Sequence, residues 1–350
     1  MAIFSLSGLS LKGISTAVPS QSEDNETLEL IPAKERKSFI EQTGVRYRRV
    51  VPAGVTASDL CVSAAEPLLQ KLNWAPTDID VLIFISQTPD YLIPNTASVI
   101  HQRLGMSKKC IALDINLGCS GYVYGLSIIG SLLQNIPGGK GLLLVGDCST
   151  CVISRQDKST WPLFSDAGSA TAIEQTGADK WQFNLQTDGS GHKDIMINSG
   201  GHRSPFSPDA LIPREYAAGV ARNDLQMSLD GINVFNFALR EVTPNIQALL
   251  SAGGIDQSSV DHFVLHQGNK LMLECIRKKL KEPESKFPYS MYYFGNTSSA
   301  SIPITIVTEL RTKITEAKTN LLLSGFGVGL SWGSAYLSID LPIILPLIEV

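Results

Sequence analysis

The sequence predicts an α/β protein made of two related halves, and three observations support this prediction. Helix-period stretches alternate with short runs of Leu, Ile and Val, which is typical of strands buried on both faces. One helix-to-strand unit occurs twice along the chain. At 350 residues the chain also exceeds the range in which one hydrophobic core keeps growing, so we expect two core-forming halves.

The repeated unit is a helix that leads through a short polar turn into an apolar strand. Its two copies place Asp80 and Asp261 at corresponding positions, 261 − 80 = 181 residues apart. The expected elements are helices at 57–72 and 235–252 and strands at 79–86 and 260–266.

A second match follows at nearly the same offset. The helix after Cys119 runs into a strand at Leu142–Gly146, and the helix after Asn296 runs into one at Leu321–Gly325, 321 − 142 = 179 residues apart. Two matches in the same order and at similar offsets predict a duplicated α/β unit with a pseudo-twofold axis.

The two halves are expected to meet near Gly177. This division gives a first half of residues 1–176 and a second half of residues 177–350. A segment rich in Gly, Ser and Pro near residues 199–223 reads as an inserted surface loop that shapes an entrance.

Composition excludes several classes of protein. The hydrophobic fraction is 43% and the charged fraction 18%, so the chain can bury a large interior and is neither disordered nor fibrous. The 29 basic and 33 acidic residues give a net charge of 29 − 33 = −4, without a long basic block. A nucleic-acid partner therefore has no electrostatic basis.

Neither export nor a membrane span is expected. Residues 1–5 lack the basic start of a secretory signal. The charge-free stretch at 320–339 is interrupted by four glycines and reads as a strand, a loop and a second strand. Six scattered cysteines fit a reducing cytoplasm. Cys148 and Cys151 form one C-x-x-C without a second pair, so no metal and no redox cofactor is expected.

Cys119 is the first candidate for chemistry. It lies between an apolar strand and a helix, where free backbone N–H groups and the helix macrodipole favour thiolate over thiol. We therefore expect a nucleophile whose own backbone N–H donates to an oxyanion. The competing interpretation is a buried structural cysteine, because free cysteines behave as small hydrophobic residues.

Three further segments are expected at the carboxyl ends of strands. His266 ends a predicted strand, Asn296 follows the apolar run Met291–Gly295, and the glycine loop Gly325–Gly329 follows another strand. Open α/β sheets bind ligands at these ends, so we expect all three to share one site with Cys119.

Other polar residues have plainer interpretations. The remaining histidines read as ordinary surface or structural residues: His101, His192, His202 and His262. The basic clusters Arg46–Arg49 and Arg277–Lys281 read as solvated faces, with contact to an acidic carrier protein or a phosphate-bearing arm as the alternative.

Five motifs in order resemble those of the β-ketoacyl-[acyl carrier protein] synthase III branch of the thiolase superfamily, over nearly the whole chain. They are Asn116–Gly121 around the cysteine, His266–Asn269 (HQ-x-N), Gly295–Ser301 (GNTS-x-AS), Phe164–Ala170 and Gly327–Ala335. The resemblance implies a thiolase-like duplicated fold, five-layered αβαβα with two mixed sheets, and a homodimer.

The resemblance also implies a mechanism. Cys119 would accept an acyl group from a thioester, with the Cys119 and Val328 backbone N–H groups holding the oxyanion. His266 and Asn296 would bind the carbonyl of a malonyl thioester on acyl carrier protein, whose decarboxylation yields the attacking enolate. The implied substrate-binding residues are Asn269, Gly231, Phe235, Leu163 and Phe164.

The sequence departs from the family where coenzyme A would bind. Ser38 and Gln42 replace a tryptophan and an arginine, and Lys158 and Leu271 replace two further arginines. The loss of a stacking ring and of guanidinium forks predicts weak nucleotide binding. We therefore expect a primer carried by acyl carrier protein, or a nonstandard acyl group, rather than acetyl-CoA. The apolar end Leu341–Ile348 is a further sign of a specialised member.

Three alternatives remain at this stage. A non-condensing acyltransferase could use the same fold and the same cysteine. A thiol hydrolase also uses Cys, His and Asn in this order, but a cysteine this far into a duplicated α/β chain does not suit it. A silent binding protein would not need Cys119, His266 and Asn296 together.

Overall fold

A computed structural model describes residues 2–350, in which one continuous sheet of ten strands forms the frame. Its main path runs β12-β13-β14-β7-β6-β4-β5, and β1 pairs with β7, β15 and β16. The strands are β1 (Ala2–Val18), β4 (Val81–Ile85), β5 (Ile111–Ile115), β6 (Lys140–Cys148), β7 (Asp166–Thr187), β12 (His262–Leu265), β13 (Thr319–Gly327), β14 (Ser331–Ile339), β15 (Ile343–Ile344) and β16 (Ile348–Glu349).

The sheet folds into two stacked layers because β1 and β7 are long enough to pass through both. The first part of β7 pairs with β6, and its last part pairs with β14. Strand β1 follows β7 antiparallel along this path, with register shifts between Ser7 and Gly13. The two mixed sheets expected from the resemblance are therefore joined by hydrogen bonds.

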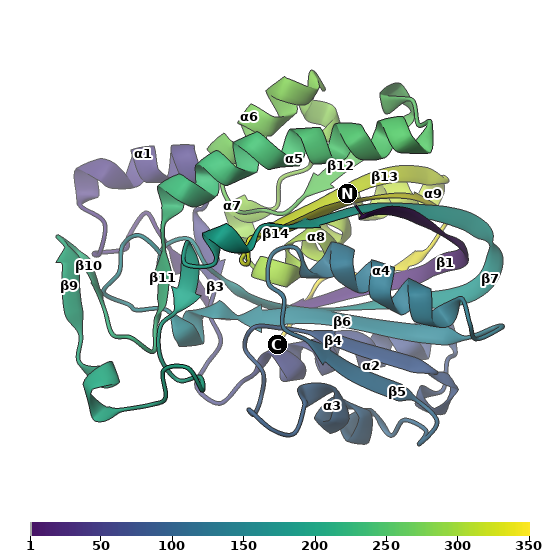
Figure 1. Cartoon of the computed structure of the whole chain (residues 1–350), viewed down its shortest axis with the longest axis horizontal. Helices are drawn as coiled ribbons and strands as arrows, with labels where there is room; N and C mark the ends of the chain where they lie inside the picture. The colour runs from purple at the N-terminus through teal and green to yellow at the C-terminus, as the bar shows by residue number, and fades with distance from the viewer. Residues whose placement is uncertain (1) are drawn as a thin grey trace.

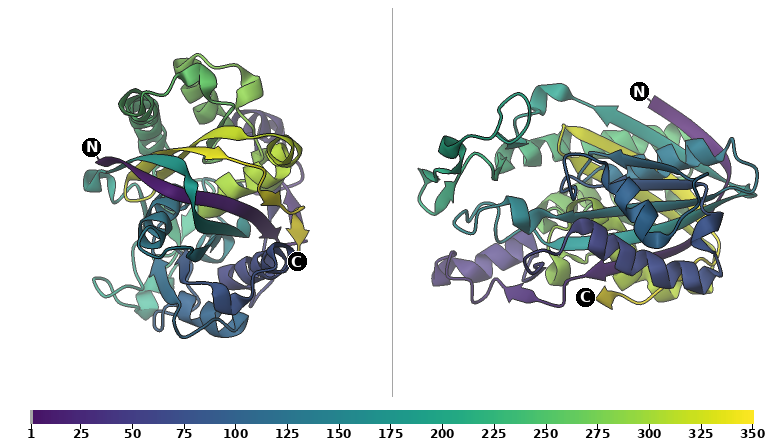
Figure 2. Two further views of the ribbon diagram at one scale, coloured as in Figure 1. Left: turned by 90° about the vertical axis from the view of Figure 1, so that its right-hand side faces the viewer. Right: turned by 90° about the horizontal axis from the view of Figure 1, so that it is seen from below.

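Helices complete five layers, which are visible in Figure 1 and end-on in Figure 2. Helices α5 and α6 cover the layer with β12–β14, α4 and α8 lie between the layers, and α2 and α3 cover the layer with β4–β6. Their bounds are α2 (Ala57–Leu72), α3 (Thr96–Leu104), α4 (Gly121–Leu133), α5 (Gly231–Gly253), α6 (Lys270–Leu280) and α8 (Ser301–Thr305).

Helix α4 is the central element of the core. Most of its residues are buried, and only the face of Tyr124, Ile128 and Ser131 is partly open, as expected for a helix enclosed by two sheets over most of its surface. A Cβ on Gly125 would lie 2.6 Å from Cδ1 of Ile85, so glycine lets the helix approach β4 closely. This packing anchors the turn that precedes α4, which carries Cys119.

Most of the repeated elements agree with the sequence-based expectation. Helix α2 matches 57–72 and begins with a capping box between Thr56 and Asp59. Strands β4 and β12 are shorter than expected, and α5 begins four residues earlier, at Gly231. The stretch 320–339 forms β13, a turn and β14, as predicted.

The run before Asn296 is not the expected strand end. Residues Met291–Phe294 form a helical turn, α7, whose Tyr293 stacks on Tyr47 with ring centroids 6.1 Å apart. Met291 and Phe294 face the core, and two tyrosines face outward. That spacing suits one helical turn better than a buried strand.

The expected boundary between the halves and the expected inserted loop both look different in the structure. The boundary between the halves, at 176/177, falls inside the continuous strand β7. The segment near 199–223 is not a plain loop, because it carries a short helical turn (Pro208–Leu211) and the hairpin β9 (Arg214–Ala217) to β10 (Val220–Arg222). It lies at the left end of the molecule in Figure 1, below α1 (Ala33–Thr43) in that view.

The apolar end of the chain packs on its own subunit. Strands β15 and β16 pair parallel with β1, so the tail continues the sheet edge. Arg49 donates to Glu349 at 2.7 Å, and Ile343 and Ile348 pack against the core beneath α2.

Candidate active site

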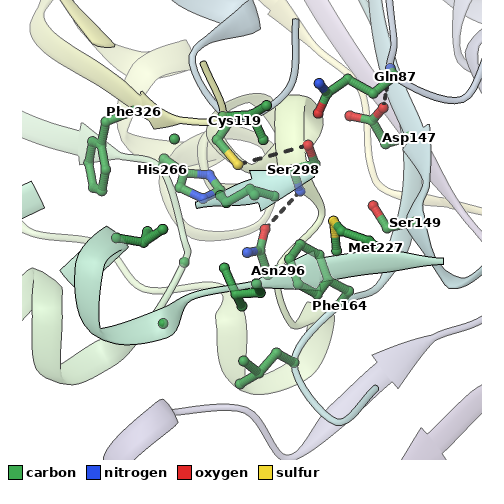
Figure 3. A pocket seen from close by; sticks show the side chains of 18 of the residues that line it. Gln87, Cys119, Asp147, Ser149, Phe164, Met227, His266, Asn296, Ser298 and Phe326 are labelled. Atoms are coloured by element: carbon green, nitrogen blue, oxygen red, sulfur yellow. Dashed lines mark hydrogen bonds between the residues drawn. The ribbon is translucent and has the colours of Figure 1, made fainter. Parts of the chain in front are cut away.

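A cavity of about 320 Å³ opens beyond the carboxyl ends of the central strands, and Figure 3 shows it. Every candidate residue from the sequence lines it. These residues are Cys119, His266, Asn296, Val328, Asn269, Gly231, Phe235, Leu163 and Phe164.

Cys119 lies in the turn between β5 and α4 with 7% of its surface exposed. The backbone N–H groups of Cys119 and Val328 both act on its sulfur and lower the pKa of the thiol. A Cβ on Gly327 would lie 3.0 Å from that sulfur, so the residue before Val328 must be small. Two backbone donors therefore converge where a carbonyl bonded to the sulfur would carry its oxyanion.

The expectation of a thiol poised to ionise at a helix N-terminus is wrong. Helix α4 begins at Gly121, two residues beyond Cys119. Burial raises the pKa of the Cys119 thiol to about 12, and the nearby Asp147 carboxylate raises it further, against the hydrogen bonds that lower it. Desolvation outweighs the helix end here, so the resting group is a thiol.

His266 follows β12 directly and is 3% exposed. Its Nδ1 lies 2.8 Å from the Ser301 hydroxyl, and its ring meets Phe326 edge-on with centroids 5.6 Å apart. Burial lowers the pKa of His266 to about 4, so the ring is neutral at pH 7. In the tautomer in which the Ser301 hydroxyl donates to Nδ1, the hydrogen sits on Nε2, which can donate to a carbonyl.

Asn296 is held by its neighbours on both sides. Its Oδ1 accepts from the backbone N–H of Ser298 at 2.9 Å, which orients the amide NH₂ as a donor. Its backbone N–H donates to the Leu163 carbonyl and its carbonyl accepts from Ser165, both at 2.9 Å. These bonds place Leu163 and Phe164 beside it in the cavity wall.

The mouth of the cavity is apolar. Strands β8 (Ile195–Ile197) and β11 (Met227–Leu229) pair antiparallel and line it together with Gly231 and Phe235 at the start of α5. Asn269 caps α6 by accepting from the Met272 N–H at 3.3 Å. A long apolar chain fits such a mouth better than a charged one.

Three residues at the deep end were missed by the sequence reasoning: Gln87, Asp147 and Ser298. They line the cavity, and Figure 3 shows Ser298 beside Cys119. A signal existed for two of them. Ser298 lies inside the motif Gly295–Ser301. Asp147 is the penultimate residue of strand β6, whose end faces the site.

The basic cluster Arg46–Arg49 is not a solvated face. Arg48 is completely buried, pairs with Glu23 and donates to the Phe164 carbonyl at 3.2 Å. Arg46 pairs with Asp24 at 3.2 Å. Since internal carboxylates neutralise these cations, the cluster supports the cavity wall rather than an outside partner.

The described residues show neither a metal cluster nor a membrane-spanning helix. Within residues 2–350, no group of three or more His, Cys, Asp or Glu side chains has a metal-binding arrangement. In the same residues, no helix combines the length and apolarity that a membrane crossing requires.

The sequence is similar to those of one protein family. Residues 113–189 match the family 3-Oxoacyl-[acyl-carrier-protein (ACP)] synthase III, and residues 250–339 match its C-terminal part. A putative 3-oxoacyl-[acyl-carrier-protein] synthase 3 of Campylobacter jejuni is 34% identical, covering 94% of this chain and 93% of its own. A beta-ketoacyl-[acyl-carrier-protein] synthase III of Lactococcus lactis is 32% identical, covering 92% and 96%.

Solved structures of similarly named proteins share the fold of this chain. A 3-oxoacyl-(acyl-carrier protein) synthase from Burkholderia xenovorans superposes with a TM-score of 0.93 at 38% identity, covering 99% of both chains. A synthase III from Pseudomonas aeruginosa gives 0.82 at 26% identity, covering 97% of this chain and 100% of its own. The thiolase-like fold expected from the motifs is confirmed.

Proposed function

Since the chain belongs to the 3-oxoacyl-[acyl-carrier-protein] synthase III family, we propose that it condenses an acyl thioester primer with malonyl-acyl carrier protein. The product is a β-ketoacyl thioester, formed with loss of CO₂. The observation that carries this proposal is the meeting of Cys119, His266 and Asn296 at the deep end of one cavity.

Acyl transfer to Cys119 is the first step. The sulfur attacks the thioester carbonyl, and the tetrahedral oxyanion lies between the Cys119 and Val328 N–H groups. The leaving thiol departs through the apolar mouth, and the acyl-enzyme remains.

Condensation is the second step. The malonyl carbonyl accepts from Nε2–H of neutral His266 and from the amide NH₂ of Asn296. These donors stabilise the enolate that CO₂ loss creates, because they need not take up or release a proton. The enolate carbon attacks the acyl group, and Cys119 leaves as the thiolate. Two carbonyl donors beside the sulfur favour condensation over the non-condensing acyltransferase, whose acceptor is a hydroxyl or an amine.

The donor is proposed to be carrier-protein-linked or to carry a nonstandard acyl group. Ser38 and Gln42 face each other on exposed α1, where the Gln42 side chain donates to Ser38 at 2.9 Å. Leu271 is 50% exposed. None of these side chains offers a ring or a guanidinium to a nucleotide.

A homodimer is part of the proposal. Strand β5 is the edge of the sheet, and its Ile111 and Leu113 are 41% and 44% exposed. In the segment before α3, Leu92 and Ile93 are each 87% exposed. Exposed apolar edges are normally covered, and a second copy of β5 would pair with this one. Leu113→Glu should shift the mass measured by light scattering from dimer to monomer, and a wild-type monomer would contradict the assignment.

Two smaller assignments complete the proposal. The halves meet at residues 176/177, and the reaction takes place in the cytoplasm. The six cysteines are all free thiols in the structure, which suits a reducing compartment. Fractionation of cells that produce the tagged protein tests the location.

The primary experiment is intact-mass analysis with a panel of acyl thioesters on carrier protein and on CoA, followed by malonyl-carrier protein. Cys119→Ala is the control. An adduct absent from the control and discharged as a β-ketoacyl product supports the proposal and identifies the primer. Discharge only to a hydroxyl or amine would favour the acyltransferase, and no adduct with any donor would overturn the proposal.

A further inference from the structure

One side of the cavity is polar, in contrast to its apolar mouth. Figure 3 shows Gln87, Asp147 and Ser149 along this side, across the Cys119 sulfur from His266. Gln87 follows β4, and Asp147 and Ser149 lie at the end of β6, which is the parallel neighbour of β4. Since the carboxyl ends of neighbouring parallel strands meet at one edge of a sheet, these side chains gather beside the nucleophile.

The Gln87 side chain lies against the turn that carries the nucleophile. A Cβ on Gly118 would lie 2.3 Å from Gln87 Oε1 and 3.2 Å from the Ser298 hydroxyl oxygen, so both oxygens are close to the residue before Cys119. The Ser298 hydroxyl is itself 3.9 Å from the Cys119 sulfur. The Gln87 carboxamide therefore lies near the first carbons of an acyl group bonded to that sulfur.

Two polar groups on this side lack a protein partner. The Gln87 backbone N–H donates to Asp147 at 2.7 Å, but within residues 2–350 no group hydrogen-bonds to the Gln87 carboxamide. Ser149 is 7% exposed, and its hydroxyl is likewise unpaired in the described part of the chain. Polar groups of this kind orient a ligand and give a cavity its specificity.

The Asp147 carboxylate is already fully engaged. One oxygen accepts from the Gln87 N–H at 2.7 Å and from the Ser86 hydroxyl at 3.3 Å. The other accepts from Ser299, from the backbone N–H at 3.2 Å and from the hydroxyl at 2.7 Å. Two bonds to each oxygen fill the lone pairs of a carboxylate. Asp147 therefore fixes the backbone of Gln87 and leaves the ligand to the unpaired groups.

The two unpaired groups suit a hydroxyl. A carboxamide and a serine hydroxyl both donate and accept, as a ligand hydroxyl does, and neither is charged. An apolar acyl chain would leave Gln87 and Ser149 without partners, which disfavours its binding. A charged substituent would be buried among neutral groups without a counterion, because the Asp147 oxygens have no free lone pair.

We propose that the primer is a hydroxyacyl thioester, whose hydroxyl, on one of the first carbons after the carbonyl, hydrogen-bonds to Gln87 and Ser149. The thioester arm occupies the apolar mouth, and the acyl group bonded to Cys119 extends along the polar side. Gln87 and Ser149 are then specificity-determining residues for acylation. This inference rests on the proposed acylation of Cys119 and adds the chemical class of the acyl group.

A competition for Cys119 tests the inference. The wild type is mixed with equal amounts of butyryl- and 3-hydroxybutyryl-carrier protein, and a second mixture uses 2-hydroxybutyryl-carrier protein. Intact-mass analysis separates the adducts, which differ by one oxygen atom, so their early ratio gives the relative rate of acylation. At least one hydroxyacyl group should load about 30-fold faster than butyryl, because the parent chain leaves buried polar groups unpaired. A preference below about threefold with both isomers would overturn the inference.

Gln87→Leu keeps the size of the side chain and removes its polarity. This variant should load butyryl at least as fast as the wild type does, and its preference for the hydroxyacyl group should fall below about threefold. Gln70→Leu, at an exposed position of α2 outside the cavity lining, is the matched control and should keep the wild-type preference. Ser149→Ala, a smaller change, should lower the preference about fivefold. An unchanged preference in both cavity variants would overturn the inference.

The proposed function and this inference fail in different ways. If no thioester acylates Cys119, with or without a hydroxyl on its acyl group, both are overturned. If butyryl and hydroxybutyryl groups load equally well, acylation of Cys119 stands and the hydroxyl-binding role of Gln87 and Ser149 is overturned.

Discussion

The deep end of the cavity and its mouth are built in different ways. At the deep end, Cys119, His266 and Asn296 are 7%, 3% and 7% exposed, and each is fixed by hydrogen bonds to the surrounding turns. The mouth depends on β8 and β11, a two-stranded pair outside the ten-stranded sheet, with side chains that range from buried Ile195 to exposed Ile197. The chemistry thus rests on the core, while the fit of the thioester arm rests on an element that can vary without disturbing it.

The largest expected effect concerns Asn296. Asn296→Ala removes a donor to the malonyl carbonyl, so condensation should fall about 10³-fold. Acyl-enzyme formation, which does not use that amide, should stay within about tenfold of wild type. Single-turnover kinetics with malonyl-carrier protein measures both steps. Asn135→Ala, at an exposed position, is the control, and retained condensation would show that His266 suffices.

Asp166, a buried residue at the start of β7, should make the free energy of unfolding depend on pH. Burial raises the pKa of Asp166 to about 6, although it accepts hydrogen bonds from the backbone N–H groups of Val51 and Thr150. A raised carboxyl pKa means that the folded state binds the proton more tightly than the unfolded state. The protonated Asp166 therefore contributes about 3 kcal/mol to the free energy of unfolding below about pH 4. This contribution is lost as the pH rises through 6.

Asp166→Asn should remove this component from the free energy of unfolding. Urea denaturation between pH 4 and 7 measures it, as the difference between wild type and variant at each pH. A difference that stays constant across this range would contradict the assignment.

Gly327→Ala tests how tightly the deep end is packed. The new Cβ would lie 2.8 Å from Cys119 Cβ, so the nucleophile or β13 must move. We expect acylation to fall about 30-fold, since small misplacements of reacting groups have large effects on rate. Gly189→Ala is the matched control, because its Cβ would meet nothing within 4 Å. Equal acylation by both variants would show that the deep end can relax.

A substitution at the mouth of the cavity should have the smallest effect on activity. Phe235→Ala removes part of the apolar wall, so kcat/KM for the primer should fall about fivefold, mainly through KM. Phe206→Ala, in the inserted segment but 61% exposed and outside the cavity lining, is the comparison. A loss in kcat as large as that from Gly327→Ala would remove the distinction between the two regions.

Much of the site was predictable because its residues lie in short motifs beside strand ends. His266 follows β12, whereas the glycine segment forms the end of β13 and the turn beyond it, and the structure brings both to Cys119. Asn296 also reached the site, although the preceding segment is α7 rather than a strand. Its position depends on backbone bonds to Leu163 and Ser165, which are distant in sequence and carry no local pattern.

The sequence by itself determined the alternation of helices and strands, the duplicated unit and the identity of the residues at the strand ends. These features depend on local periodicity and on residue type. Only the tertiary structure decided that β1 and β7 join two layers, that Arg48 is buried against Glu23, and that Ser298 and Asp147 lie beside the sulfur. It also decided that the resting cysteine is a thiol, because desolvation depends on everything packed around a group and not on its neighbours in the chain.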